Sequence, residues 1–472
     1  MTPPQAILTT LLVYQIALLV IGILAQRRTH DGLDFFLGGR RIGPLVAALS
    51  AAASSSSAWT LLGVSGAAYA WGLSALWIFP SCVGGFLLNW YVLAPALRQV
   101  SHERGAITVT EVLAGPPGRP LRGAISLAAS LIILVSLGAY VASQFQGAGK
   151  TFSETFGLSP TTSILIGSGI VILYTLLGGF WAVSLTDTLQ GLVMVAAAVV
   201  LPSASLLAVG GPEGLMVGLS SVQVEGFLSL TQNLPVAAAV GFILGLLGIG
   251  IGYPGQPHVV NRFMALKKGE RALRKGRRIA IVWAVVVYAG MLLLGLCGRV
   301  LYPHLADREV VFLVATNQLF PPIVGGVLVA AVLSAIMSTA DSQLLVASSS
   351  VTYDLNLGGP SSRSLLFRSR LVVLCLSAGA VLAALYGTRE IFSQVLFAWT
   401  AMGAAFGPLL LVTVLRGPVS PRLTLLAMVT GFVLSVAAYS FPETRGGALE
   451  RIVPFAAALC ITQLSRFDPN RH

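Results

Sequence analysis

Residues 48–59 read Ala48-Leu49-Ser50-Ala51-Ala52-Ala53-Ser54-Ser55-Ser56-Ser57-Ala58-Trp59. Residues 248–258 read Gly248-Ile249-Gly250-Ile251-Gly252-Tyr253-Pro254-Gly255-Gln256-Pro257-His258. Serine hydroxyls compete with the helix for backbone hydrogen bonds, and glycine and proline disfavour or break helices. Each stretch lies inside an apolar run long enough for a helix, at 44–70 and at 233–258. We therefore predict one interrupted helix in each run.

The composition is that of a membrane protein. Of the 472 residues, 56% are hydrophobic and 10% are charged, whereas soluble domains carry about 25% charged residues. The mean hydropathy is +0.85. These values argue against a soluble enzyme, a nucleic-acid-binding protein and a disordered scaffold. Since about 20 apolar residues cross a bilayer, we predict an all-α polytopic membrane protein with about thirteen transmembrane helices, at 6–26, 44–70, 73–98, 123–149, 160–178, 186–207, 233–258, 279–302, 321–352, 370–387, 391–415, 423–441 and 450–465.

The two interrupted runs also predict the internal organisation of this single transmembrane domain. Backbone groups released by a helix break cannot face lipid, so they must line a protein-buried or water-filled cavity. Transporters with inverted repeats place substrate and ion between two such broken helices. Beyond the extra helix at 6–26, the ranges 44–207 and 233–415 form two five-helix halves, each beginning with an interrupted helix, and 423–465 adds two trailing helices. The alternative is that the small residues only permit close helix packing.

The basic residues are distributed unevenly over the predicted loops. With thirteen spans, 23 of the 29 Lys and Arg residues fall on one side of the membrane. The positive-inside rule then predicts a multi-pass protein of the cytoplasmic (inner) membrane with its N-terminus outside and its C-terminus in the cytoplasm. The basic cluster at 267–278 is interpreted as part of this signal, facing anionic lipid; a nucleic-acid-binding patch is the alternative.

A polar helix face is predicted in the ninth span. Ser338, Asp341 and Ser342 follow i, i+3, i+4 spacing and share one side of a helix, with Thr339 at its edge. Hydroxyl and carboxylate oxygens in a low dielectric suit a small, hard cation better than a soft metal. The alternative is that each hydroxyl bonds to a carbonyl of its own helix.

Three further side chains are candidates for function. Asp187 begins the sixth span, in Thr186-Asp187-Thr188-Leu189-Gln190-Gly191. Carboxylates inside a membrane are rare and usually paired or functional, whereas an aspartate at a helix start can also be an N-cap; both interpretations stay open. Trp59 and Tyr253 stand beside the two breaks, where they could line a pocket or belong to an interfacial aromatic belt.

These motifs together resemble the sodium/solute symporter family, and in particular its bacterial sodium/proline symporters. The matching residues run in order from about residue 30 to 420 and include Leu49-Ser50-Ala51, Ala53-Ser54, Ser57-Ala58-Trp59, Thr186-Asp187, Gln190-Gly191, Gly252-Tyr253, Gly255-Gln256-Pro257-His258, Arg262-Phe263-Met264-Ala265, Met337-Ser338-Thr339, Gln343-Leu344-Leu345-Val346 and Ser348-Ser349. The resemblance implies a LeuT-like five-plus-five inverted repeat with one extra N-terminal helix and two C-terminal helices.

The resemblance also implies where ligands bind. Sodium would lie between the first broken helix and the ninth span, at the carbonyls of Ala53, Ser56 and Ala335 and the hydroxyls of Ser338 and Thr339. A second cation site or coupling site is implied at Asp187, Asp341 and Ser342. The solute would bind at Ser57, Trp59, Ile249, Tyr253 and Pro257.

Two positions depart from the pattern of the proline carriers. Ser55 stands where those proteins have an aspartate that is important for sodium dependence, and Ile249 stands where they have a tryptophan in the pocket. We predict a sodium-coupled secondary active symporter that imports a small organic solute, most of all proline or a similar amino acid, by alternating access. The alternatives are proton coupling through Asp187 or Asp341, a carboxylate, sugar or vitamin as solute, and a channel, for which no filter motif or charge ring is evident.

No enzymatic activity is expected. The histidines are scattered, without nucleophile–base or metal-ligand spacing, at His30, His102, His258, His304 and His472. The cysteines lie in apolar stretches and are expected to pack as small hydrophobic residues, at Cys82, Cys297, Cys375 and Cys460. The expected partners are therefore the solute, sodium and the lipid bilayer, with no nucleic acid and no obligatory protein partner.

Overall fold

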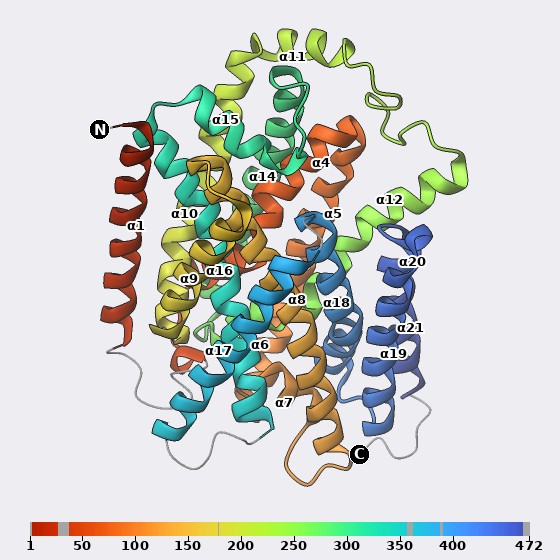
Figure 1. The fold of residues 1–472 in the computed structure, drawn as a ribbon. Coiled ribbons are helices and arrows are strands. Elements are labelled where there is room, and N and C mark those ends of the chain that lie inside the picture. The colour runs from red at the N-terminus through yellow and green to blue at the C-terminus, as the bar shows by residue number, and fades with distance from the viewer. Residues whose placement is uncertain (1, 27–36, 178, 356–361, 388–389, 466–472) are drawn as a thin grey trace.

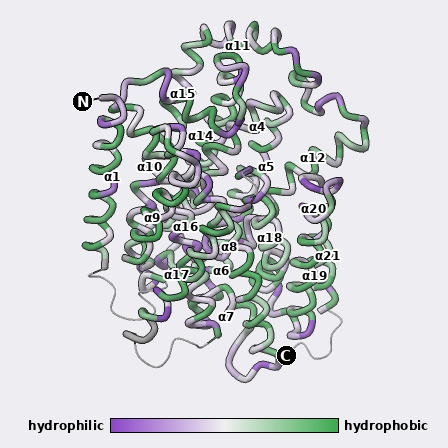
Figure 2. The backbone as a smooth tube through the Cα atoms, viewed as in Figure 1, coloured by the Kyte–Doolittle hydropathy of each residue, from purple (hydrophilic) through white to green (hydrophobic). Residues whose placement is uncertain are grey.

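The computed structural model describes residues 2–26, 37–177, 179–355, 362–387 and 390–465. It is a bundle of helices, most of which run along one common direction (Figure 1). Within the described ranges, nine helices are long and apolar enough to cross a membrane. Hydrophobic residues follow the outer helices along their length (Figure 2), with exposed side chains such as Val13, Leu131, Leu173, Leu382 and Val433. The predicted all-α polytopic membrane fold is confirmed.

The first part of the chain runs from α1 to α11. Its helices are α1 (Pro3–Gln26), α3 (Pro44–Ser55), α4 (Val64–Trp71), α5 (Ile78–Leu87), α6 (Ala94–Arg104), α7 (Val109–Ala114), α8 (Arg122–Phe156), α9 (Pro160–Leu177), α10 (Phe180–Ala208) and α11 (Gly211–Ser220). Short helical turns complete them: η1 (Gly38–Arg40), η2 (Trp59–Gly63), η3 (Gly72–Trp77) and η4 (Leu88–Leu93).

The second part runs from α12 to α21. Its helices are α12 (Val236–Ile251), α13 (Pro257–Ala265), α14 (Glu270–Leu301), α15 (Val311–Leu319), α16 (Pro322–Ser349), α17 (Ser362–Tyr386), α18 (Ile391–Arg416), α19 (Pro421–Ser440), α20 (Ala448–Arg451) and α21 (Val453–Leu464). The short turns are η5 (Tyr253–Gly255), η6 (Arg308–Val310), η7 (Ser350–Asp354) and η8 (Pro442–Thr444). The division into halves at 44–207 and 233–415 stays a prediction, as does the count of thirteen spans.

The first predicted break lies between α3 and η2. α3 continues through Ser54 and ends at Ser55, and Ser56 leaves the helical conformation at φ −121° and ψ 83°. The serine run therefore ends the helix only at its C-terminal side. The Ser54 hydroxyl bonds to Asp187 of α10, at 3.2 Å, whereas the Ser55 hydroxyl at the end of α3 bonds to the Ala52 carbonyl of its own helix, at 2.9 Å.

The second predicted break lies between α12 and α13. α12 ends at Ile251, Gln256 is extended at φ −101° and ψ 95°, and α13 begins at Pro257. Proline suits the first position of a helix because that position needs no N–H donor. Gly248 and Gly250 are not part of the break: a Cβ on Gly250 would come within 2.2 Å of the Ser81 carbonyl oxygen. These two glycines instead permit close helix packing, which is the alternative interpretation of the small residues.

The bundle has one basic end, the lower end in Figure 1, where α6 and α7 lie. Arg98 and Arg104 belong to α6, Arg119 follows α7, and Lys267 and Lys268 lie beside Arg98. Five of the basic residues used for the predicted topology lie outside the described residues: Arg27, Arg28, Arg389, Arg466 and Arg471. Arg262, another basic residue used for the predicted topology, is not a surface residue, since its side chain is 1% exposed.

A buried carboxylate joins three elements at the opposite end. Glu309 of η6 accepts the backbone N–H groups of Ile391, at 3.1 Å, and Phe392, at 2.8 Å, in the first turn of α18. It also pairs with Lys150 of α8, at 2.5 Å, and its side chain is 1% exposed. The first N–H groups of a helix have no partner within the helix and favour a negative charge. Glu309 therefore caps α18 and holds it to α8.

The packing around α12 gives a stability prediction. We expect Gly250→Ala to lower the melting temperature of the purified protein in detergent, because the added methyl group meets the backbone of Ser81 and overpacking costs about 1–3 kcal/mol. The matched control is Gly241→Ala in the same helix, where a Cβ has no atom within 4 Å. That change should be neutral or stabilising, since alanine favours a helix over glycine. Equal melting temperatures for the two variants would contradict the packing argument.

Candidate functional site

The oxygens of the predicted sodium site converge where α3 ends beside α16. Ser338 donates to the carbonyl of Ala53 at 3.2 Å, and Thr339 lies 3.5 Å from the same carbonyl oxygen. The Ser338 hydroxyl is also 3.3 Å from the carbonyl of Ala335. Ser56 donates its backbone N–H to the Ala53 carbonyl at 3.1 Å. All five residues of the predicted set are fully buried.

This arrangement suits a monovalent cation. The last carbonyls of a helix have no partner within the helix and carry partial negative charge. The break after Ser55 leaves such carbonyls in the middle of the bundle, and α16 supplies two hydroxyl oxygens beside them. Two of these hydroxyls therefore point across to another helix, as the polar-face interpretation of the ninth span requires. Broken helices of transporters coordinate sodium with such carbonyls.

A buried arginine holds the predicted coupling residues together. Arg262 of α13 lies 3.2 Å from Asp187 Oδ2 of α10 and donates to the hydroxyl of Ser50 of α3 at 3.0 Å. It also bonds to the Ser342 hydroxyl of α16. Ser50 donates to Asp187 at 2.7 Å. Four helices thus meet at one ion pair, and Asp187 is a paired carboxylate within α10, not an N-cap.

Asp341 is only partly joined to this group. The Ser342 hydroxyl lies 3.4 Å from Asp341 Oδ1 and 2.9 Å from the hydroxyl of Ser54. Asp341 is completely buried but lines a small cavity with residues of α9, α10 and α17, among them Thr175, Val183 and Ser369. The structure therefore brings Asp187 and Ser342 together through Arg262, whereas Asp341 faces the neighbouring side of α16.

Aromatic rings surround the two breaks. Trp59 packs against Tyr288 of α14 and Phe392 of α18, with ring centroids 6.3 and 5.6 Å away. The hydroxyls of Tyr253 and Tyr288 are 2.9 Å apart. Trp59 and Tyr253, predicted as pocket walls, are therefore linked through Tyr288. Among the described residues no hydrogen-bond acceptor is found for the buried Trp59 indole N–H.

The other predicted pocket residues lie along the same breaks. Ser57 accepts the hydroxyl of Tyr140 of α8 at 3.3 Å and the backbone N–H of Trp59 at 3.2 Å. Ile249 is buried one turn before the second break, and its carbonyl accepts the indole N–H of Trp399 at 3.1 Å. Pro257 is buried at the start of α13. The backbone at the second break is thus held by α18.

Sequence reasoning missed five residues of this region. Arg262 enters the sequence analysis only as a basic residue and as part of a matching motif, without a role in the site, and the other four are Tyr140, Gln144, Tyr288 and Trp399. Gln144 accepts the backbone N–H of Ala58 at 3.0 Å, directly after the first break. The available signal was a polar or aromatic side chain in the middle of a predicted span, because such residues are seldom placed in hydrocarbon without a partner.

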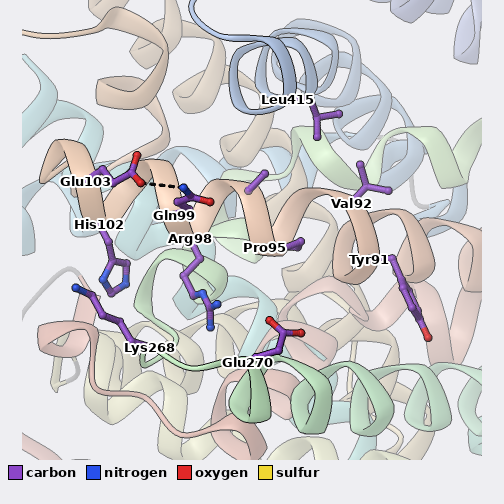
Figure 3. Close-up of a pocket in the computed structure, with 11 residues that line it drawn as sticks. Tyr91, Val92, Pro95, Arg98, Gln99, His102, Glu103, Lys268, Glu270 and Leu415 are labelled. Carbon is purple, nitrogen blue, oxygen red and sulfur yellow. Dashed lines mark hydrogen bonds between the residues drawn. The ribbon is translucent and has the colours of Figure 1, made fainter.

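A cavity of about 730 Å³ lies elsewhere, between α6 and the start of α14 at the basic end (Figure 3). Its lining includes Tyr91, Arg98, His102, Lys268 and Glu270. None of the predicted site residues lines it. The candidate site is therefore the region of the two breaks, not this surface cavity.

The comparisons with known proteins identify the family of this chain. Residues 35–431 match the model of the family described as "Sodium:solute symporter family". The chain belongs to the sodium:solute symporter family. As a family member it is 36% identical to the high-affinity proline transporter PutP of Bacillus subtilis (strain 168), over 94% of each chain. It is 34% identical to the sodium/proline symporter of Escherichia coli (strain K12), over 90% of this chain and 86% of that one.

Solved structures show the same fold in this symporter-family chain. A Na+-coupled sialic acid symporter, in a substrate-bound outward-open state, superposes with a TM-score of 0.81 at 17% identity over 98% of both chains. MhsT in complex with L-phenylalanine gives a TM-score of 0.54 at 14% identity, over 89% of this chain and 98% of that one. The LeuT-like fold is therefore confirmed, and the homologues are transporters of a multi-pass membrane type.

The ion pair gives a second prediction. Asp187→Asn should destabilise the purified protein, because it leaves the buried guanidinium of Arg262 without its counter-charge, a change that costs about 3–5 kcal/mol. Arg308→Gln breaks the partly exposed pair with Glu390 and should cost no more than about 1 kcal/mol. Thermal unfolding in detergent measures both.

A double variant distinguishes the lost pair from a lost hydrogen bond. Asp187→Asn combined with Arg262→Gln removes both charges, so it should recover part of the melting temperature lost in Asp187→Asn. A double variant that is less stable than Asp187→Asn alone would contradict the assignment of Arg262 as the counter-charge.

Proposed function

We propose that the chain imports a small amino acid, with proline as the first candidate, by symport with sodium across the cytoplasmic membrane. The observation that carries the proposal is the meeting of two α16 hydroxyls with the end of the broken helix α3, at the Ala53 carbonyl. The proteins with 34–37% identity that are named proline transporters or sodium/proline symporters support proline as the solute.

Sodium binds, in this proposal, at the carbonyls of Ala53, Ser56 and Ala335 and the hydroxyls of Ser338 and Thr339. The ion would tie α3 to α16 and so favour one arrangement of the broken helix. A ligand shifts such an equilibrium only through its different affinity for the two states. The carbonyls exposed by the break provide that difference, because they meet α16 only while α3 stays beside it.

The solute binds between the breaks, at Ser57, Trp59, Ile249, Tyr253 and Pro257. Trp59 offers a buried indole N–H without a partner among the described residues, which a carboxylate of the solute would accept. The rings of Trp59 and Tyr253 suit the apolar body of a small amino acid. Ile249 leaves this wall aliphatic where proline carriers have a tryptophan.

The group of Asp187, Asp341 and Ser342 acts, in this proposal, as the coupling site. Arg262 already provides a cation to Asp187 and Ser342, so these residues would hold the basic end closed as long as Arg262 stays in place. We propose that this end faces the cytoplasm, with the N-terminus outside. Opening inward would then require α13 to withdraw Arg262 from α3, α10 and α16.

The function is tested by uptake of labelled proline into proteoliposomes. A sodium gradient should drive accumulation, and an equal potassium gradient should not. Accumulation driven by a pH gradient without sodium would contradict sodium coupling and would point to a carboxylate as the coupling group. If sodium drives uptake of another amino acid but not of proline, only the assignment of proline as the solute is contradicted.

The ion site has its own prediction. Ser338→Ala combined with Thr339→Val should raise the sodium concentration for half-maximal uptake by about tenfold or more, since hydrogen-bonding or ligating oxygens in such sites contribute on the order of 1–2 kcal/mol each. The matched control is Ser349→Ala on the same helix, whose hydroxyl bonds to the Val346 carbonyl of that helix. Sodium dependence like that of the wild type in the double variant would contradict the site.

A further inference from the structure

The extra N-terminal helix α1 makes polar contacts inside the bundle that its place at the edge does not require. It stands beside α9, α10 and α16 (Figure 1). Much of its surface faces outward, with Leu12 54% and Val13 63% exposed. Yet the Tyr14 hydroxyl lies 2.5 Å from the hydroxyl of Ser334, and Gln15 donates to the sulfur of Met337 at 3.2 Å.

Tyr14 is placed too deep to be an interfacial aromatic residue. α1 has 24 residues, which at 1.5 Å per residue is about 36 Å, and Tyr14 lies near its middle. Belt tyrosines sit at the ends of spans, at the level of the lipid head groups. At mid-depth a phenol needs a protein partner, and α16 supplies it.

The direction of this hydrogen bond follows from the partners. Ser334 uses its single hydroxyl hydrogen toward the carbonyl of Ala330, at 2.6 Å. Tyr14 must therefore donate to Ser334, which gives an ordered chain from Tyr14 through Ser334 to the α16 backbone. Close packing supports the contact, because a Cβ on Gly326 of α16 would come within 2.8 Å of Thr10.

The two residues that α1 holds are the immediate neighbours of proposed sodium ligands. Ser334 precedes Ala335, and Met337 precedes Ser338. Ser334 and Ser338 also stand one turn apart on α16. The hydroxyls of Ser338 and Thr339 reach the Ala53 carbonyl at only 3.2 and 3.5 Å. A rotation of α16 by about 10° would move a side-chain atom at the helix surface by about 1 Å, enough to lose such contacts.

We infer that Tyr14 and Gln15 are positioning residues for the sodium site, acting through Ser334 and Met337. The inference rests on the proposed sodium site of the previous subsection. α1 contributes no ligand to the ion. It fixes the rotation of α16 and thereby the direction of the Ser338 and Thr339 hydroxyls.

The test is a double-variant cycle of Tyr14→Phe and Ser334→Ala, measured as the sodium dependence of solute uptake in proteoliposomes. Tyr14→Phe keeps the ring and leaves Ser334 bonded to Ala330, so the fold should persist. We expect it to raise the half-saturating sodium concentration about threefold, the average effect of an interhelical hydrogen bond in a membrane, with the solute KM at saturating sodium unchanged. The double variant should raise the half-saturating sodium concentration by no more than the larger of the two single variants does.

The matched control is Thr9→Val on α1, whose hydroxyl bonds to the Gln5 carbonyl of its own helix. It should leave sodium dependence unchanged. If Tyr14→Phe lowers maximal uptake and protein stability without shifting the sodium dependence, its role is structural and the inference is wrong. Additive shifts in the double variant would contradict the Tyr14–Ser334 link. If Tyr14→Phe expresses poorly, Gln15→Leu gives an independent test. It should also raise the half-saturating sodium concentration.

The wild type separates this inference from the proposed function. Uptake by the wild type that does not respond to sodium would contradict the proposed function, whatever the variants do. A sodium-dependent wild type together with an unshifted Tyr14→Phe would contradict the role of α1 alone.

Discussion

Backbone polar groups that cannot face lipid decide the arrangement of this bundle. Each break in α3–η2 and α12–α13 releases carbonyl and N–H groups at the depth of the hydrocarbon. The structure satisfies them with side chains from other helices, such as Gln144 at Ala58 and Trp399 at Ile249. α8 and α18 are therefore held beside the breaks, and the Ala53 carbonyl meets the hydroxyls of Ser338 and Thr339 from α16.

Two buried charged groups join the helices of this bundle by different chemistry. The guanidinium of Arg262 joins side chains from α3, α10 and α16. The carboxylate of Glu309 bonds to the backbone of α18 and to Lys150. A buried ion pair is weak evidence for stability, because desolvation offsets much of its attraction. The ion pair and the serine contacts of Arg262 form only when α13 lies against the other three helices, whereas its bond to the His258 carbonyl stays within α13.

Much of the fold could be predicted from the sequence, because its signals are local. Long apolar runs predict the spans, and Ser56 and Gln256 fall where the serine run and the Gly/Pro run end their helices. The i, i+3, i+4 spacing of Ser338, Asp341 and Ser342 predicts a polar face on α16, and the hydroxyls of Ser338 and the neighbouring Thr339 meet the Ala53 carbonyl. The partner of Asp187 could not be predicted in this way. Arg262 is 75 residues away, and a basic residue before a basic loop resembles a topology signal until the helices are placed in space.

The cap on α18 has a mechanical consequence. Glu309 bonds to backbone N–H groups of residues 391 and 392, so the attachment does not depend on which side chains stand there. η6 follows α14 in the chain, and its Glu309 carboxylate bonds to the start of α18 and to the Lys150 ammonium group of α8. Glu309 therefore joins three elements at one buried carboxylate. Because Glu309 is buried from water, added salt will screen its ion pair with Lys150 far less than the more exposed pair of Arg308 and Glu390.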